Sequence, residues 1–149
     1  MGADALEAAR ERLRACLRGL WRQLRGQRLF ESEQDREAMM ELRRAVFLSP
    51  YEAEAHLLIG RIHLRAGRPR EAVDALKISI WSKDTAGAHV AMADAYLRLK
   101  DVPGARAQVQ KALALDPNSA EAKALLNRID AGGRPDLKVG PHEARAPRG

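Results

Sequence analysis

Few side chains in this sequence could carry catalytic or metal chemistry. The candidates are four histidines and one cysteine, which could serve as general bases, metal ligands or a nucleophile. A metal site on a helix needs a second ligand one turn away, and no histidine has a His, Cys or acidic residue at i+3 or i+4. Cys16 has no histidine near it in sequence, so we expect a buried structural thiol. P-loop, dinucleotide-binding and nucleophile-elbow motifs are absent. We therefore expect no enzyme activity, no metal and no cofactor, with His56, His63 and His89 in the core and His142 in the tail.

The strongest pattern in the chain is an internal repeat between Ala53 and Pro117, with an offset of 33 residues. Each copy holds two runs of apolar residues at helical spacing, separated by a turn signal, which predicts a helical hairpin. Pro69 suits the first turn of a second helix, because its missing N–H has no partner there anyway. A fixed period of this length predicts an array of units that pack on their neighbours. The residues that recur unchanged are Ala53, Ala55, His56, Leu64, Arg65 and Ala72, as Ala86, Ala88, His89, Leu97, Arg98 and Ala105.

These residues resemble the tetratricopeptide repeat, whose pattern runs W-x2-L-G-x2-Y, then A-x3-F, then P. The second copy supplies His89-x2-Met92-Ala93-x2-Tyr96, then Ala105-x3-Val109 and Pro117. The first copy supplies His56-x2-Ile59-Gly60-x2-His63 and Ala72-x3-Leu76, with Asp84 in the proline position. The resemblance places His56, His63 and His89 in positions that the family fills with large aromatic residues.

A degenerate copy lies upstream of these two units. Its second helix follows the repeat pattern, with Ala38, Leu42 and Ala45. Its first helix matches the pattern only at Gly26 and Leu29, and it has Arg22 and Arg25 in positions that the pattern fills with apolar residues. Downstream, residues 118–129 predict one further helix that caps the array. We therefore expect an all-α fold: a short α-solenoid of antiparallel helical hairpins, with two clear repeats and one degenerate repeat, an N-terminal amphipathic helix and a C-terminal capping helix.

The resemblance also implies a binding surface, because the first helix of each hairpin in such arrays lines a concave groove. An apolar row beside a basic row suits a protein or peptide partner with apolar anchors and an acidic or carboxylate group. The alternative is that the arginines are only a solvated face. The predicted groove residues are Leu57, Arg61, Leu64, Arg65, Val90, Asp94, Leu97, Arg98 and Arg128, together with Glu54, Gly87, and Glu121 and Ala124 of the capping helix.

One known use of the family is a clamp of Lys and Asn that holds the C-terminal carboxylate of chaperone tails. The resemblance places Leu57 and Arg61 in the first Lys and Asn positions of this clamp and Ala91 in the next Asn position. The last two basic positions hold Glu121 and Leu125. Because the clamp residues are missing, we do not expect an adaptor for chaperone tails.

The net charge of +6 is unevenly distributed. Residues 1–30 carry +4, residues 31–130 are neutral and residues 131–149 carry +2. This divides the chain into a basic N-terminal helix (1–30, including the first helix of the degenerate unit), a repeat domain with its cap (31–130) and a Gly/Pro-rich basic tail expected to be disordered (131–149). Because the repeat body is neutral, nucleic acid is not an expected partner.

The N-terminal helix is amphipathic, with a stripe of leucines and arginines mostly off that stripe. The preferred interpretation is that the stripe packs on the first good hairpin as a cap. The alternatives are self-association into a homo-oligomer through the stripe, or docking to an acidic membrane or nucleic acid; the few aromatics and two glycines make a membrane role less expected. The leucine stripe consists of Leu6, Leu13, Leu17, Leu20 and Leu24.

The expected location of the protein is the cytoplasm. The sequence has no run of 18 apolar residues and its N-terminus is charged. The single cysteine cannot form an internal disulfide, which agrees with a reducing compartment. A chain that is a fragment of a longer, exported protein would defeat this expectation.

Overall fold

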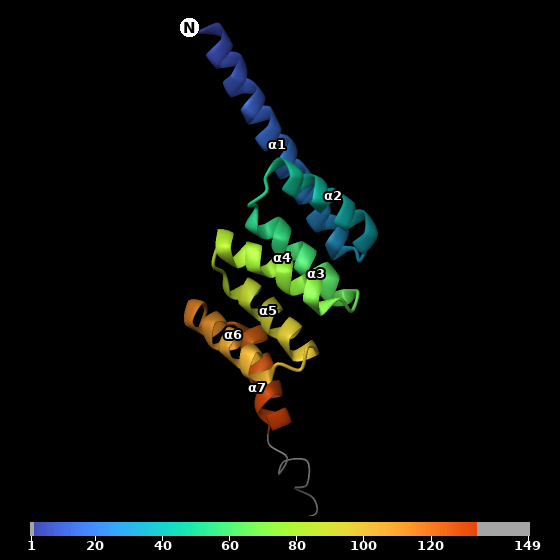
Figure 1. The fold of residues 1–149 in the computed structure, drawn as a ribbon, viewed down its shortest axis with the longest axis vertical. Coiled ribbons are helices and arrows are strands. Elements are labelled where there is room, and N and C mark those ends of the chain that lie inside the picture. Colours follow the sequence, from blue (N-terminus) through green and yellow to red (C-terminus); the bar gives the residue numbers. More distant parts are fainter. Residues whose placement is uncertain (1, 134–149) are drawn as a thin grey trace, which may run out of the picture.

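The computed structural model describes residues 2–133, and every regular element in this range is an α-helix (Figure 1). The helices form three antiparallel pairs, and a single helix follows the third pair. Their bounds are α1 Ala3–Glu31, α2 Asp35–Leu48, α3 Ala53–Arg65, α4 Pro69–Ser82, α5 Ala86–Arg98, α6 Val102–Leu115 and α7 Ala120–Gly133.

The pairs α1–α2, α3–α4 and α5–α6 are helical hairpins that stack in chain order, and α7 covers the end of the stack (Figure 1). The all-α solenoid predicted from the repeat is confirmed, including the capping helix. Each junction between neighbouring units encloses its own cluster of buried apolar side chains, as expected where a unit has no core of its own. Residues 134–149 of the predicted tail lie outside the described range, and the division of the chain at residues 30 and 130 stays a prediction.

The three hairpins share the same turn. Glu33, Gly67 and Lys100 occupy equivalent positions and all have a positive φ, between 60° and 70°. The backbone N–H of the residue after each of them donates to a carbonyl five residues earlier, as in Gln34 to Leu29 at 2.8 Å. This is the Schellman cap, which satisfies carbonyls at a helix end through one left-handed residue. The degenerate first unit therefore ends its first helix in the same way as the two clear repeats.

A second shared feature is the close approach of the two helices in each hairpin. A Cβ atom added to Gly26 or Gly60 would lie 2.7 Å from Leu42 or Leu76. The equivalent pair in the third hairpin is Ala93 with Val109, both fully buried. A larger residue on the first helix is thus matched by a smaller one on the second.

Arg22, which the sequence places in an apolar position, is accommodated by an ion pair. Its Nη1 lies 3.0 Å from Oε2 of Glu41, and Nη1 of Arg44 lies 3.2 Å from the other carboxylate oxygen. The side chain of Glu41 is only 9% exposed, so the two arginines neutralise a largely buried carboxylate. A polar contact therefore replaces the apolar one in the first hairpin.

The leucine stripe does not pack on a hairpin, so the preferred interpretation of the N-terminal helix is wrong. Helix α1 has 29 residues and its partner α2 has 14, so the first half of α1 projects beyond the stack (Figure 1). The leucines of the stripe are 44–61% exposed. Cys16 lies in the same projecting half and is exposed, which corrects the expectation of a buried thiol.

Candidate functional site: a groove across α3, α5 and α7

The predicted concave surface contains a hollow of about 460 Å³. It lies across the first helices of the second and third hairpins and the capping helix. Its lining combines apolar residues with charged ones. The lining residues are Arg61, Leu64, Val90, Ala91, Asp94, Arg98, Glu121, Ala124, Leu125 and Arg128.

The base of this groove is apolar. Leu64, Val90, Ala91 and Leu125 belong to the buried clusters between units, with 6–8% of each residue exposed. The sequence interpretation names Ala91 and Leu125 only because they stand where the carboxylate clamp needs Asn and a basic residue. Their place in the repeat was already a signal, because small or apolar residues at clamp positions leave an apolar surface. The groove can therefore bury an apolar side chain of a partner.

The charged rim of the groove centres on Asp94. Its carboxylate lies 3.1 Å from Nε of Arg98 and 3.8 Å from Nη2 of Arg128. Arg61 belongs to α3, whereas Asp94 and Arg98 belong to α5. Arg61 makes no ion pair with any residue in the range 2–133. Arg61 and the 67%-exposed Arg128 are thus the arginines of the groove most available to an acidic ligand.

Arg65 lies outside the hollow, and its guanidinium group contacts the preceding hairpin. Nη1 lies 2.9 Å from Oδ1 of Asp35, and both terminal nitrogens donate to the carbonyl of Phe30 at 3.2 Å. The group also stacks over the Phe30 ring at 3.7 Å from its centroid. Arg65 therefore connects α3 to the turn between α1 and α2.

Arg98 makes the equivalent contact one unit later. Its Nη1 donates to the carbonyl of Leu64 at 2.7 Å, near the end of the preceding first helix. Such carbonyls have no partner within their own helix. The repeated arginines, expected as a basic row for a ligand, thus link successive units, and Ala131 occupies the next equivalent position.

The remaining predicted groove residues do not line the hollow; these are Glu54, Leu57, Gly87 and Leu97. Leu57 is buried in the cluster between the second and third hairpins, and Leu97 packs against the cluster below the cap. Eight of the thirteen predicted groove residues therefore line the hollow, and the other five do not. Their role in binding a partner stays a prediction.

The histidines form contacts within the fold. His56 donates from Nε2 to the carbonyl of Pro50 at 2.7 Å, and the ring of His89 lies 2.6 Å from both Asp84 and Gln108. Burial, with a smaller effect of Arg68, lowers the pKa of His63, whose Nδ1 has no hydrogen-bond partner among the described residues. No group of three possible metal ligands occurs within residues 2–133.

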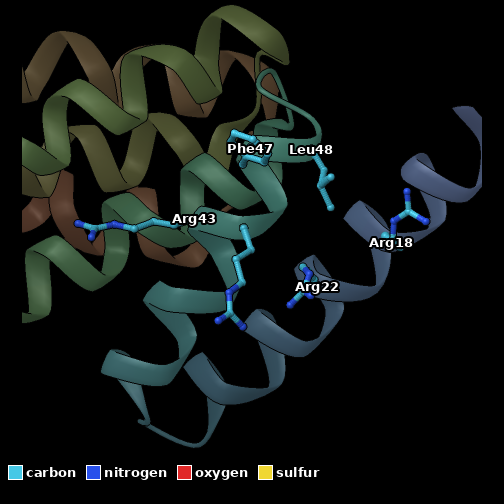
Figure 2. A pocket seen from close by; sticks show the side chains of 6 residues that line it. Arg18, Arg22, Arg43, Phe47 and Leu48 are labelled. Atoms are coloured by element: carbon cyan, nitrogen blue, oxygen red, sulfur yellow. The ribbon is translucent and has the colours of Figure 1, made fainter.

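A second hollow, of about 440 Å³, lies between the projecting half of α1 and the end of α2 (Figure 2). Sequence reasoning did not predict it, because it depends on where α1 leaves α2. Phe47 is 85% exposed beside it. Three of its four arginines are already paired with Glu11 or Glu41. The lining residues are Arg18, Arg22, Arg43, Arg44, Phe47 and Leu48.

Comparison with known proteins bears on the fold. The family model of the tetratricopeptide repeat matches residues 86–119, which span α5, α6 and the turn before α7. No curated protein matches the chain in sequence. Within residues 2–133, no helix is both long and apolar enough to cross a membrane.

Several solved structures share the arrangement of helices. The first TPR domain of Spaghetti (RPAP3), bound to the HSP90 peptide SRMEEVD, has a TM-score of 0.74 at 18% identity and covers 78% of this chain and 93% of its own. The Arabidopsis OM64 TPR domain has a TM-score of 0.76 at 17% identity, covering 79% and 98%. PcrH, in complex with the chaperone-binding region of PopD, has a TM-score of 0.64 at 18% identity, covering 97% and 96%. Residues 86–119 therefore match a tetratricopeptide repeat, and the helices of the chain are arranged as in solved tetratricopeptide-repeat domains.

Proposed function

We propose that this protein is a non-enzymatic interaction module that binds a segment of a partner protein in the groove across α3, α5 and α7. The observation that carries this proposal is the composition of the hollow. An apolar base that crosses the first helices of two successive hairpins and the capping helix is bordered by arginines, of which Arg61 is partly exposed and Arg128 is exposed. Apolar anchors give affinity and charged borders give orientation in peptide recognition.

The similar structures support peptide binding as the mode of action. The Spaghetti domain is described with an HSP90 peptide, a second RPAP3 domain with the HSP70 peptide SGPTIEEVD, and PcrH with a region of PopD. The groove of this chain differs in chemistry from a carboxylate clamp, because Ala91 and Leu125 present apolar side chains and Glu121 presents a negative charge. We infer a partner segment with an apolar side chain for the base and an internal acidic residue for Arg61 or Arg128, in place of a C-terminal carboxylate.

The experiment must change the groove without changing the fold. Arg65 and Arg98 are unsuitable, because both connect neighbouring hairpins. Arg61→Glu with Arg128→Glu reverses the charges of a partly exposed and an exposed arginine. Arg128 lies 3.8 Å from Asp94 and neither arginine makes a shorter polar contact to another described residue, so we expect the melting temperature to change little. Arg70→Glu on α4, at an exposed residue outside both hollows described above, is the control for a charge reversal away from the groove.

A phage-displayed library of short random peptides is selected on the wild-type protein, and each selected peptide is titrated against the variants. We expect peptides that contain an apolar residue near an acidic one, with binding weakened at least tenfold by the double reversal and unchanged by Arg70→Glu. Peptides that bind the double variant as tightly as the wild type would show that the groove is not the binding site. The cytoplasmic location stays a prediction.

A further inference from the structure

The first hairpin exposes a face that the other hairpins bury. Trp21 and Leu24 of α1 are 64% and 44% exposed. Their equivalents in α3 are Ala55 and Leu58, which are 0% and 2% exposed in the cluster shared with the preceding hairpin. The corresponding residues of α5, Ala88 and Ala91, are buried in the same manner. Trp21 and Leu24 thus belong to a surface built for packing between units.

The projecting half of α1 extends this surface. Leu6, Leu13, Leu17 and Leu20 continue the row at steps of three, four and seven residues, and each is at least half exposed. The end of α2 approaches α1 at Gly19, and the part of α1 before that level has no other described element beside it (Figure 1). An apolar row of this length is typical of a helix that pairs with another helix.

The charges on α1 indicate what that other helix is. All acidic residues before Glu31 fall in the first eleven positions, at Asp4, Glu7 and Glu11, whereas the segment 12–30 contains six arginines and no acidic residue. An anionic membrane would repel the acidic end of this helix. A parallel copy would place each arginine opposite its own equivalent. An antiparallel copy would place acidic residues opposite arginines.

We propose that two copies of the protein pair through an antiparallel contact of their α1 helices. A two-fold axis near residue 15 places Leu13 opposite Leu17 and Leu6 opposite Leu24 of the second copy. The same axis brings Asp4 and Glu7 of each chain alongside Arg25 and Arg28 of the other. This dimer leaves the groove across α3, α5 and α7 uncovered, so the inference is independent of the proposed function.

The first test measures mass in solution. Sedimentation equilibrium of the full chain should give twice the 16.5 kDa of one chain at tens of micromolar. Leu13→Glu with Leu17→Glu should give the single mass and the same helix content by circular dichroism, because both leucines are more than half exposed and glutamate is a good helix former. Leu115→Glu, a change at a 48%-exposed leucine of α6, is the matched control and should leave the dimer intact.

The second test establishes the direction of the helices. Glu7→Arg and Arg25→Glu should each weaken the dimer about tenfold, because each change creates like charges on both sides of the axis. The chain that carries both changes should recover most of the wild-type affinity, since the exchanged residues face each other again.

Three results would overturn the proposal. These are a wild-type chain that stays monomeric at hundreds of micromolar, a Leu13→Glu/Leu17→Glu chain that stays dimeric, and a chain with both charge changes whose dimer is weaker than that of either single variant.

Binding to vesicles of phosphatidylglycerol and phosphatidylcholine tests the alternative of a membrane. A wild-type monomer that binds these vesicles through the leucine stripe would assign the stripe to a membrane and contradict the dimer.

Discussion

Replacing Gly60 with alanine should destabilise the protein, although alanine is the better helix former. The new Cβ atom would lie 2.7 Å from Cγ and 2.9 Å from Cδ2 of Leu76. Leu76 is fully buried, so its side chain cannot turn away into solvent. The carbonyl oxygen of Ala72, 3.4 Å from the same point, limits movement of the helix in the other direction.

Two opposing free energies decide the result. Overpacking of a close-packed core costs about 1–3 kcal/mol. The change from glycine to alanine inside a helix favours the folded state by about 1 kcal/mol. We therefore expect the free energy of unfolding of Gly60→Ala to fall by about 1 kcal/mol.

In the third hairpin a different pair of residues makes the same contact. Ala93 occupies the position of Gly60, and the smaller Val109 occupies the position of Leu76. Leu76→Val alone should cost about 1 kcal/mol, because it removes a buried methylene group. In the double variant the added and removed carbon atoms compensate each other, and stability should return to within about 0.5 kcal/mol of the wild type.

Urea unfolding followed by far-ultraviolet circular dichroism measures all four corners of this cycle. We expect a coupling free energy of about 2 kcal/mol between the two positions. Additive effects, or a Gly60→Ala variant more stable than the wild type, would refute the close contact and the register of the helices within the hairpin.

Three further predictions concern the stability of the repeats. Ala105→Leu, at a fully buried position of α6, should lower the free energy of unfolding by about 1–3 kcal/mol, and an unchanged urea midpoint would contradict the packing of α6. Lys100→Gly should stabilise the protein by about 0.5–1 kcal/mol, because glycine tolerates the φ of 62°. Gly67→Ala should destabilise it for the same reason. If calorimetry shows that both changes alter stability in the same direction, the result is inconsistent with the shared turn. The lowered pKa of His63 means that the unfolded chain binds more protons, so stability should fall as pH drops below about 6.5, and a His63→Leu chain with an equally steep pH dependence would exclude this cause.

The fold could be predicted from the sequence because its information is local and repeated. The offset of 33 residues, the helical spacing in each copy and the position of Pro69 establish the hairpins without knowledge of long-range contacts. The buried alanine at positions 72 and 105 follows from the same register. Such signals suffice for an array, since the contacts between helices lie within one unit or between successive units.

The candidate site could be predicted less completely. Sequence spacing places Arg65 and Arg98 on the first helices, but it does not show that their long side chains reach the carbonyls of Phe30 and Leu64. The exposure of the leucine stripe was missed for a related reason. Periodicity shows that a helix has an apolar face, but it does not show that α1 turns Gly19, Gln23 and Gly26 toward α2, so that no described hairpin covers its leucines.

The central claim is that a partner segment occupies the groove across α3, α5 and α7. Amide-resolved NMR during titration with a peptide selected on the wild-type protein tests it most directly. We predict that the largest shift changes fall on residues around Arg61, Val90 and Arg128, with little change in the first half of α1. Changes confined to residues 3–25, with the groove unaffected, would contradict the account and assign binding to the N-terminal helix.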